Sequence, residues 1–426
     1  MQHLRSQAHS LLRKSESIFK TDMVYLAKGS FWFAFSQAIV SLSSFGLAIA
    51  FAHFLTKEAY GQYKYILSIA GLLGTITLTG LPSAVMRAIS QGYDGTLSYA
   101  FWKNIRWSAI SALAAALLGG YYFYKGNNSL GISMLFVGSL WPFFQSSNLY
   151  NSYLVAKKDF KRNAIYFEII GNIFPILALL LTMTQTGNPT WLVATYLVSN
   201  TFIGLILYRR VISIYAPRGP IDEHALGYSK HLSFMGILSG IAAHLDQILV
   251  FQYIGAAELA IYNFATAIPN QAKGPLKGLS TLMFPKFVER DEKEIQSGMN
   301  HKYLVMFMAG LALTIVYICA APYIFYYLFP QYTDSIIYSQ IFALSFLSIT
   351  FNPADVYLSA KKKIHEQYIG TLTNAVIQII MTFVAIINWG LLGLIIARVA
   401  VRMLGNLTSL ALYHYSIKRD LKLHGE

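Results

Sequence analysis

Two pairs of basic residues lie inside long apolar stretches of this 426-residue chain. Lys273 is followed by Lys277, and Arg398 by Arg402, so each pair has the i, i+4 spacing that places both side chains on one face of a helix. A cation is costly within a membrane and marks either a functional site or a fixed partner. The chemistry that such pairs offer is anion binding, and the planar fork of arginine can hold two phosphate oxygens.

Each pair also has a structural interpretation. Pro269 and Pro275 interrupt the segment of Lys273 and Lys277, which indicates a broken helix bordering protein or a water-filled cavity. The alternative is that both lysines reach past the kinked backbone to the cytoplasmic interface. For the arginine pair, bonding to helix-end carbonyls or to a carboxylate is as good an interpretation as anion binding.

Asp246 is the most informative acid because it lies well within an apolar segment, beside His244. It can pair permanently with a cation, or it can take up H⁺ or Na⁺ and couple transport to an ion gradient. Pairing is the preferred interpretation, since a single acid is weak evidence for a coupling site. His244 can titrate near neutral pH, although a hydrogen-bonded packing role is the commoner one for such a histidine.

Other kinds of site find no support in the sequence. The chain has one cysteine, Cys319, so a disulfide framework is excluded. No nucleotide-binding P-loop and no cluster with metal-ligand spacing occurs, so we expect neither direct ATP use nor a metal or other cofactor. No catalytic residues are predicted.

The composition is that of an all-α integral membrane protein, being 55% hydrophobic and 12% charged. Apolar runs of about 20 residues, long enough to cross a bilayer, recur from end to end. Hydropathy and helix breakers predict twelve transmembrane helices. These run over residues 29–54, 64–85, 104–124, 130–156, 163–184, 190–209, 230–254, 258–286, 300–328, 335–358, 368–388 and 391–415.

The Lys and Arg residues are distributed unequally between the two predicted sides of the membrane. Of 33 Lys and Arg residues, 26 lie at the N-terminus, in the joins after even-numbered helices, or in the C-terminal tail. The joins after odd-numbered helices hold only Lys57, Lys64 and Lys125. By the positive-inside rule both termini are cytoplasmic. This distribution accounts for the net charge of +14 without a nucleic-acid partner.

The two halves of the chain repeat one another. "YLVAKK" (153–158) ends the fourth predicted helix and "YLSAKK" (357–362) ends the tenth. "FLTKEAYGQY" (54–63) aligns with "YIGAAELAIY" (253–262) at the outer join of each half. We therefore predict two parallel six-helix repeats around a central cavity. The predicted divisions are an N-terminal cytoplasmic segment, an N-lobe, a linker, a C-lobe and a cytoplasmic tail, over residues 1–28, 29–209, 210–229, 230–415 and 416–426.

These motifs resemble the multidrug/oligosaccharidyl-lipid/polysaccharide exporter (MOP) superfamily, and within it the O-antigen (Wzx-type) polysaccharide flippases. The resemblance rests on the two "YL.AKK" exits, "LDQILVFQYIGAAELAIYNFA" (245–265), "LMFPKF" (282–287) and "GLPSAVMRAIS" (80–90). It implies a two-lobed transporter that moves an undecaprenyl-pyrophosphate-linked oligosaccharide from the inner to the outer leaflet of the cell (inner) membrane by alternating access. Family position gives Arg87 a role at the cavity mouth, and positive-inside anchoring explains it nearly as well.

The sign of the buried charge separates the candidate functions. Lys273, Lys277, Arg398 and Arg402 outnumber Asp246, and a cavity of that sign draws an anionic substrate. The alternative is a cation-coupled multidrug antiporter of the same superfamily, which would be expected to hold several buried carboxylates. A membrane-embedded glycan polymerase or glycosyltransferase is the weaker third interpretation, because the outer joins are short. Expected partners are the lipid-linked oligosaccharide, membrane lipids, H⁺ or Na⁺, and the glycan polymerase machinery.

Overall fold

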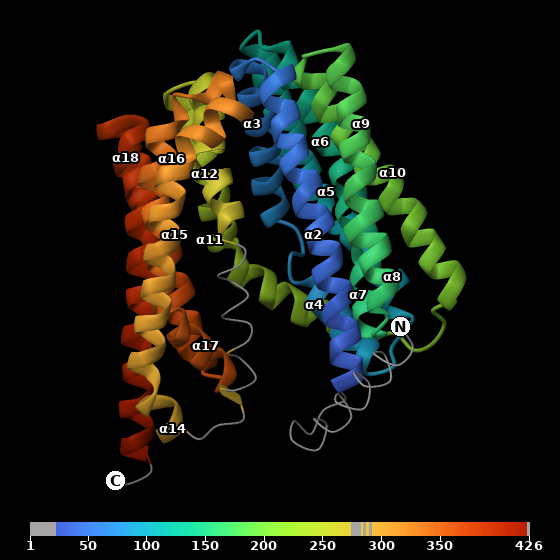
Figure 1. Ribbon diagram of the computed structural model, residues 1–426. Coiled ribbons are helices and arrows are strands. Elements are labelled where there is room, and N and C mark those ends of the chain that lie inside the picture. Colours follow the sequence, from blue (N-terminus) through green and yellow to red (C-terminus); the bar gives the residue numbers. More distant parts are fainter. Residues whose placement is uncertain (1–22, 274–282, 284–286, 289–291, 424–426) are drawn as a thin grey trace, which may run out of the picture. The chain divides into compact units, whose positions relative to one another are not determined.

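The computed structural model describes residues 23–273, 283, 287–288 and 292–423 (Figure 1). Within these ranges the chain forms helices and turns, with no β-strand. Contacts between Cα atoms group the chain into two compact units. The first consists of residues up to Ala50 together with Ile76–Met235, and the second of Phe51–Thr75 together with the chain from Gly236 onward.

The first unit is a bundle of antiparallel helices packed around an apolar core. Buried side chains from four of its helices form one apolar cluster, with Val85, Phe101, Tyr150 and Tyr208 among them. Its elements are most of α2 (Met23–Phe54), α4 (Leu81–Ser90), α5 (Thr96–Tyr124), α6 (Asn128–Ser147), α7 (Leu149–Ala156), α8 (Phe160–Asn163), the π-helix η1 (Ala164–Ile170), α9 (Gly171–Gln185), α10 (Pro189–Tyr215) and the first part of α11 (His224–Tyr253).

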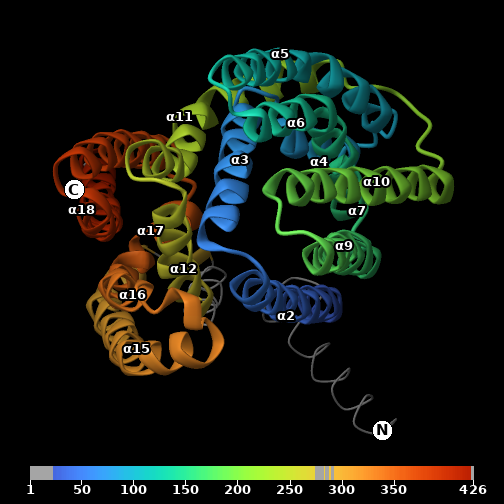
Figure 2. The same ribbon diagram turned by 90° about the horizontal axis from the view of Figure 1, so that it is seen from above.

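The second unit contains the end of α2, the rest of α11, and the elements that follow. Figure 2 looks along its helices and shows α15, α16 and α18 side by side. The elements are α3 (Lys57–Thr75), α12 (Ala256–Ala272), α14 (Glu292–Ser297), α15 (Met299–Leu328), the 3₁₀ helices η2 (Pro330–Tyr332) and η3 (Leu344–Phe351), α16 (Ser335–Ala343), α17 (Asn352–Ala360) and α18 (Ile364–Leu423).

Helix α18 consists of two arms that meet at Gly390. This residue has φ 59° and ψ −143°, a conformation that costs glycine little and other residues much. The arms run back along each other, because Gly370 packs against Leu412 and Gly405 against Asn374. The predicted eleventh and twelfth helices, 368–388 and 391–415, are these two arms.

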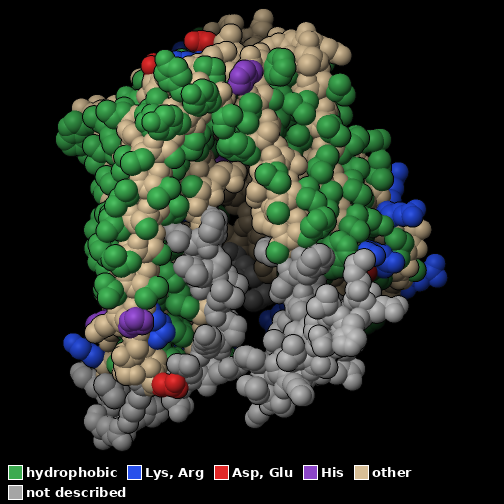
Figure 3. Space-filling model, in the orientation of Figure 1, with side chains coloured by type: hydrophobic (Ala, Val, Ile, Leu, Met, Phe, Trp, Pro, Cys, Tyr) green, Lys and Arg blue, Asp and Glu red, His purple; other side chains and the backbone are tan. Residues whose placement is uncertain are grey.

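Six helical segments of the described residues are long and apolar enough to cross a membrane. On the face of the second unit seen in Figure 3, hydrophobic side chains cover α15 and charged side chains lie near its ends, as expected for a lipid-facing helix. The six segments are Ala34–Phe54, Phe160–Gln185, Pro189–Tyr215, Met299–Leu328, Ser335–Ala360 and Ile364–Arg419, the last of which spans both arms of α18.

Several predicted helices are interrupted. The continuous helix predicted over 64–85 is wrong, because α3 ends at Thr75 and α4 begins at Leu81 with Pro82 in its first turn. Proline is favoured at that position because the first N–H groups of a helix have no intrahelical partner. The predicted helix 335–358 is in fact α16, the 3₁₀ helix η3 and α17 in succession.

The repeated "YL.AKK" phrases adopt the same backbone. Lys158 and Lys362 both lie in the left-handed region, with φ of 61° and 55°. The N–H groups of Lys157 and Lys361 each donate to the carbonyl four residues earlier, over 2.9 Å. The next two N–H groups also bond backward in matching order in both copies, which is the pattern of a helix ended by a left-handed residue. The outer joins agree as well, since α2 and α11 end, and α3 and α12 begin, 199 residues apart.

The compact units and the predicted lobes differ in two stretches, of which residues 230–235, the start of the predicted C-lobe, group with the first unit. Residues 51–75 lie well within the predicted N-lobe, yet they group with the second unit. Close packing explains this, because Gly61 of α3 lies against the Ala256 carbonyl of α12 so tightly that a Cβ atom there would collide with it. The lobe limits 29–209 and 230–415 stay a prediction.

The join after α7 is fixed by a polar cluster. Asp159 caps α8 by accepting from the Arg162 N–H at 3.0 Å, and it also accepts from the Arg162 guanidinium at 2.9 Å and the Tyr215 hydroxyl at 2.5 Å. Partial burial raises the pKa of this carboxyl, but the hydrogen bonds from Tyr215 and Arg162 outweigh burial and hold the pKa below its usual value.

Candidate functional site

The second unit brings together ionisable residues from α11, α12 and α18, which lie far apart in the sequence. Asp246 comes from α11, Lys273 from the end of α12, and Arg398 and Arg402 from the second arm of α18. Lys273 and Arg402 both contact η3, a 3₁₀ helix of eight residues. Runs of that length are uncommon, and inside a longer helical stretch they often occur at functional hinges.

Asp246 is held by three neighbours. One carboxylate oxygen accepts from the backbone N–H of Gln247 at 2.9 Å, and the other accepts from the Tyr262 hydroxyl. The Nε atom of Arg398 is 3.4 Å from this second oxygen, without the geometry of a hydrogen bond. The carboxylate is only 3% exposed and the guanidinium side chain 18%. Such a pair needs mutual neutralisation, because a single buried charge would be strongly destabilising.

Arg402 and Lys273 both bind Ser345 of η3. Arg402 donates to the Ser345 hydroxyl at 3.1 Å and to the Asn270 side-chain oxygen at 3.0 Å. Lys273 donates to the Ser345 carbonyl at 3.0 Å. Within the described ranges, no carboxylate lies at ion-pair distance from Arg402, which instead stacks over the Phe342 ring, 4.4 Å from its centroid. Two cations thus converge on one residue, and the hydrogen-bond acceptors of Arg402 among the described residues are neutral.

The remaining predicted site residues are not part of this group. His244 is half-buried against α3, where a Cβ atom on Gly71 would collide with the imidazole. Arg87 is exposed in the last turn of α4, in the first unit. Lys277 lies outside the described residues. No group of three His, Cys, Asp or Glu side chains among the described residues is placed to hold a metal ion.

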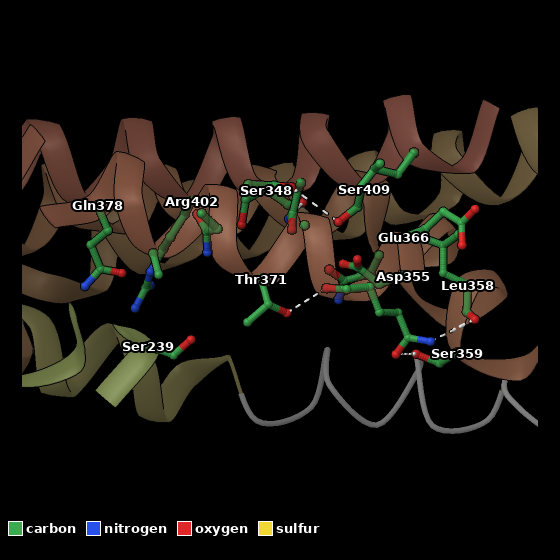
Figure 4. Close-up of a pocket in the computed structure, with 18 of the residues that line it drawn as sticks. Ser239, Ser348, Asp355, Leu358, Ser359, Glu366, Thr371, Gln378, Arg402 and Ser409 are labelled. Carbon is green, nitrogen blue, oxygen red and sulfur yellow. Dashed lines mark hydrogen bonds between the residues drawn. The ribbon is translucent and has the colours of Figure 1, made fainter. Parts of the chain in front are cut away.

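A polar cavity of about 530 Å³ adjoins Arg402 and Lys273 within the second unit. Most of it lies between the two arms of α18, α17 and the end of η3. Figure 4 shows Gln378 and Arg402 toward one end and Asp355 and Glu366 toward the other. Between the two ends the lining is largely neutral and polar, and it includes Asn352, Gln367, Thr371, Asn374, Asn406 and Ser409.

Sequence reasoning did not select the two acids of this cavity. Neither Asp355 nor Glu366 was singled out as a site residue. Glu366 is 1% exposed and faces Arg419, whose guanidinium nitrogen is 2.8 Å from its carboxylate. The 52 residues between Glu366 and Arg419 contain the reversal at Gly390, so only knowledge of the hairpin would have paired them.

Comparison with solved structures defines the class of fold. The chain is similar to the lipid II flippase MurJ in an inward closed conformation, with 15% identity, a TM-score of 0.71, and coverage of 91% of this chain and 87% of that one. It is also similar to a multidrug resistance MATE family transporter of the MOP superfamily in its inward-facing conformation, with 14% identity, a TM-score of 0.66, and coverage of 89% and 95%.

A third similar structure is a MOP superfamily transporter from Pyrococcus furiosus, for which a binding pocket of reverse polarity suggests a different function. It has 14% identity to this chain, a TM-score of 0.56, and coverage of 93% and 95%. Identities this low show the fold alone. That fold is the all-α, twelve-span fold of the MOP superfamily, in two parallel six-helix repeats, so the chain is a multi-pass membrane protein.

The family follows from a match to a family model. Residues 26–290 match the family described as polysaccharide biosynthesis protein, and this range is more than half of the chain. The chain therefore belongs to that family. No curated protein matches it.

Proposed function

We propose that the protein is a flippase that moves an undecaprenyl-pyrophosphate-linked oligosaccharide from the inner to the outer leaflet, for synthesis of a surface polysaccharide such as O-antigen. It works by alternating access and is not an enzyme. Membership of the polysaccharide biosynthesis family and the transporter fold support this function.

The convergence of Arg402 and Lys273 on Ser345 is the observation that carries the proposal. A diphosphate has several oxygens that accept charge-assisted hydrogen bonds, and arginine can hold two of them at once. The hydrogen-bond partners of Arg402 among the described residues are neutral oxygens, which an anion can displace. Arg398, by contrast, already faces the carboxylate of Asp246.

The same charges argue against the multidrug antiporter. A site for cationic drugs is expected to present several buried carboxylates, whereas Asp246 is compensated by Arg398 and two cations, Arg402 and Lys273, adjoin the cavity. The contacts of Asp246 favour a pairing role over uptake of H⁺ or Na⁺, and His244 has a packing role in the same helix. Arg87 acts at the cavity mouth, with anchoring at the cytoplasmic interface as the alternative, and Lys277 joins Lys273 in attracting the substrate.

The remaining parts of the proposal concern location. The protein lies in the cell (inner) membrane with both termini cytoplasmic, which the distribution of Lys and Arg supports. The prenyl tail of the substrate stays among membrane lipids while the sugars pass through the protein. Contact with the glycan polymerase machinery stays a prediction.

Surface glycan in variant strains tests the role of the cations. We expect Arg402→Ala and Lys273→Ala each to lower surface glycan at least about tenfold at unchanged protein level, because each removes a charge-assisted contact. The control is Lys418→Ala, which removes an exposed charge from the same helix α18. Normal glycan in the double variant would remove both cations from the mechanism. Altered drug sensitivity with normal glycan would favour the antiporter.

A further inference from the structure

The cavity between the arms of α18 has opposite charge at its two ends. Arg402 and Lys273 lie at one end, and the acids Asp355 and Glu366 lie toward the other (Figure 4). Glu366 is compensated by Arg419 at 2.8 Å. Asp355 lies near the Ser409 hydroxyl, and no cation of the described residues lies at ion-pair distance from it. The uncompensated negative charge of this end therefore belongs to Asp355.

The size and lining of the cavity suit a carbohydrate. Its volume of about 530 Å³ is within the range of small-molecule sites. Side-chain amides and hydroxyls line the space between the charged ends, and these groups can both donate to and accept from sugar hydroxyls. Gly370 and Gly405 also lie in the walls, where the absence of a side chain lets the two arms approach closely.

Some of the polar atoms of the lining lack a partner. The side-chain oxygen of Asn374 and the hydroxyl of Ser239 are buried and have no hydrogen-bond partner among the described residues. Buried polar groups are rarely left unsatisfied, because each such group costs free energy. Both atoms can accept a hydrogen bond from a hydroxyl group, so a polyhydroxylated ligand in the cavity would satisfy them.

The distance between the ends fits a phosphorylated sugar. Arg402 and Ser409 are seven residues apart on one helical arm, which corresponds to about 10 Å along its axis at 1.5 Å per residue. A phosphate bound at Arg402 thus places the far side of an attached sugar near Ser409 and Asp355. At that end a carboxylate repels an acidic sugar and attracts a donor group, most strongly a protonated amine.

We propose that this cavity binds the phosphate-proximal sugar of the lipid-linked glycan and that Asp355 selects a sugar with donor groups, above all an amino sugar, over an acidic one. The inference rests on the proposed flippase function and adds the class of sugar. In this arrangement Arg402 and Lys273 bind the phosphate, and the amides and hydroxyls of the α18 arms bind the sugar ring. Asp355 contacts the sugar substituent farthest from the phosphate.

Binding of three soluble probes to the purified full-length protein in lipid nanodiscs tests this selection. Glucosamine 1-phosphate, glucose 1-phosphate and glucuronic acid 1-phosphate share a phosphate and a ring but differ in the charge of the sugar. We expect the amino sugar to bind at least about tenfold more tightly than the acidic sugar, the effect of one hydrogen bond to a charged group. Glucose 1-phosphate should fall between them.

Three variants assign the effect to residues. Asp355→Asn should remove the preference between the amino and acidic probes while phosphate binding remains. Asn374→Leu should weaken all three probes with their order unchanged, and Arg402→Gln should weaken all three by a similar factor because it acts on the shared phosphate. Lys418→Ala should change nothing.

Equal binding of all three probes by the unaltered protein would overturn the selection by Asp355, and so would a preference that survives in Asp355→Asn. Binding of none of the probes would overturn the assignment of the cavity to a phosphorylated sugar. Neither result bears on the flippase function. That function is refuted separately if the lipid-linked glycan reaches the outer leaflet normally in cells without the protein.

Discussion

The Asp246–Arg398 pair offers a sharp test of how charge is balanced in the second unit. Replacing Arg398 by Met leaves the 3%-exposed carboxylate of Asp246 with only Tyr262 and a backbone N–H as partners. Replacing Asp246 by Leu leaves the guanidinium buried beside an apolar group. Both single changes should destabilise the fold, whereas Asp246→Leu combined with Tyr262→Phe and Arg398→Met removes the pair and its hydroxyl partner together.

The magnitude follows from the geometry. At the 3.4 Å separation of the Arg398 nitrogen and the Asp246 oxygen, the attraction between unit charges is about 5 kcal/mol at an effective dielectric constant of about 20. The cost of desolvating both charges offsets much of that gain. Removal of one partner should therefore cost roughly 3–5 kcal/mol, while the apolar triple variant should come within about 1 kcal/mol of the unaltered protein.

Unfolding free energies of the purified protein in detergent micelles provide the assay. Losses in the single variants that simply add up in the combined variant would refute the pairing, because independent sites are additive. Transport gives a second readout. If Asp246 only pairs with Arg398, the triple variant should still produce surface glycan. Loss of glycan in a well-folded triple variant would instead assign Asp246 to ion coupling.

Two further predictions concern packing and pH. Gly61→Ala should reduce the yield of folded protein sharply because the new methyl group collides with a carbonyl of α12, whereas Gly120→Ala, which meets open space within a helix, should be neutral or stabilising; the yields of monodisperse protein decide. The carboxyl of Asp159, with its pKa held below the unfolded value near 3.8, stabilises the fold above that pH and loses this contribution as the pH falls through its folded pKa. Between pH 5 and pH 3 the unaltered protein should therefore lose more thermal stability than Asp159→Asn, and equal losses would contradict the hydrogen-bond account.

The fold was predictable where the sequence repeats. The "YL.AKK" phrases identified equivalent helix ends, and the structure gives Lys158 and Lys362 the same left-handed backbone. The break between α3 and α4 was missed because apolar residues continue through it, although the Pro82 signal for a new helix was present. The π-helix η1 and the 3₁₀ helix η3 have no comparable signal, because they arise from packing rather than from local propensity.

Of the candidate site, only the charged residues could be predicted from the sequence. Lys273 and Arg402 stood out as cations within apolar segments, but their common partner Ser345 lies 72 and 57 residues away from them. Periodicity cannot reveal a meeting over such distances. Asp355 looked interfacial because three lysines follow it closely, and its place in the cavity depends on where the arms of α18 reverse.

The most direct test of the central claim measures the lipid-linked oligosaccharide on each face of the membrane in cells that lack the protein. The flippase account predicts that undecaprenyl-pyrophosphate-linked oligosaccharide accumulates in the inner leaflet and that surface polysaccharide is lost, with both restored by the unaltered gene but not by Arg402→Ala. A normal distribution between the leaflets with normal surface polysaccharide would contradict the account.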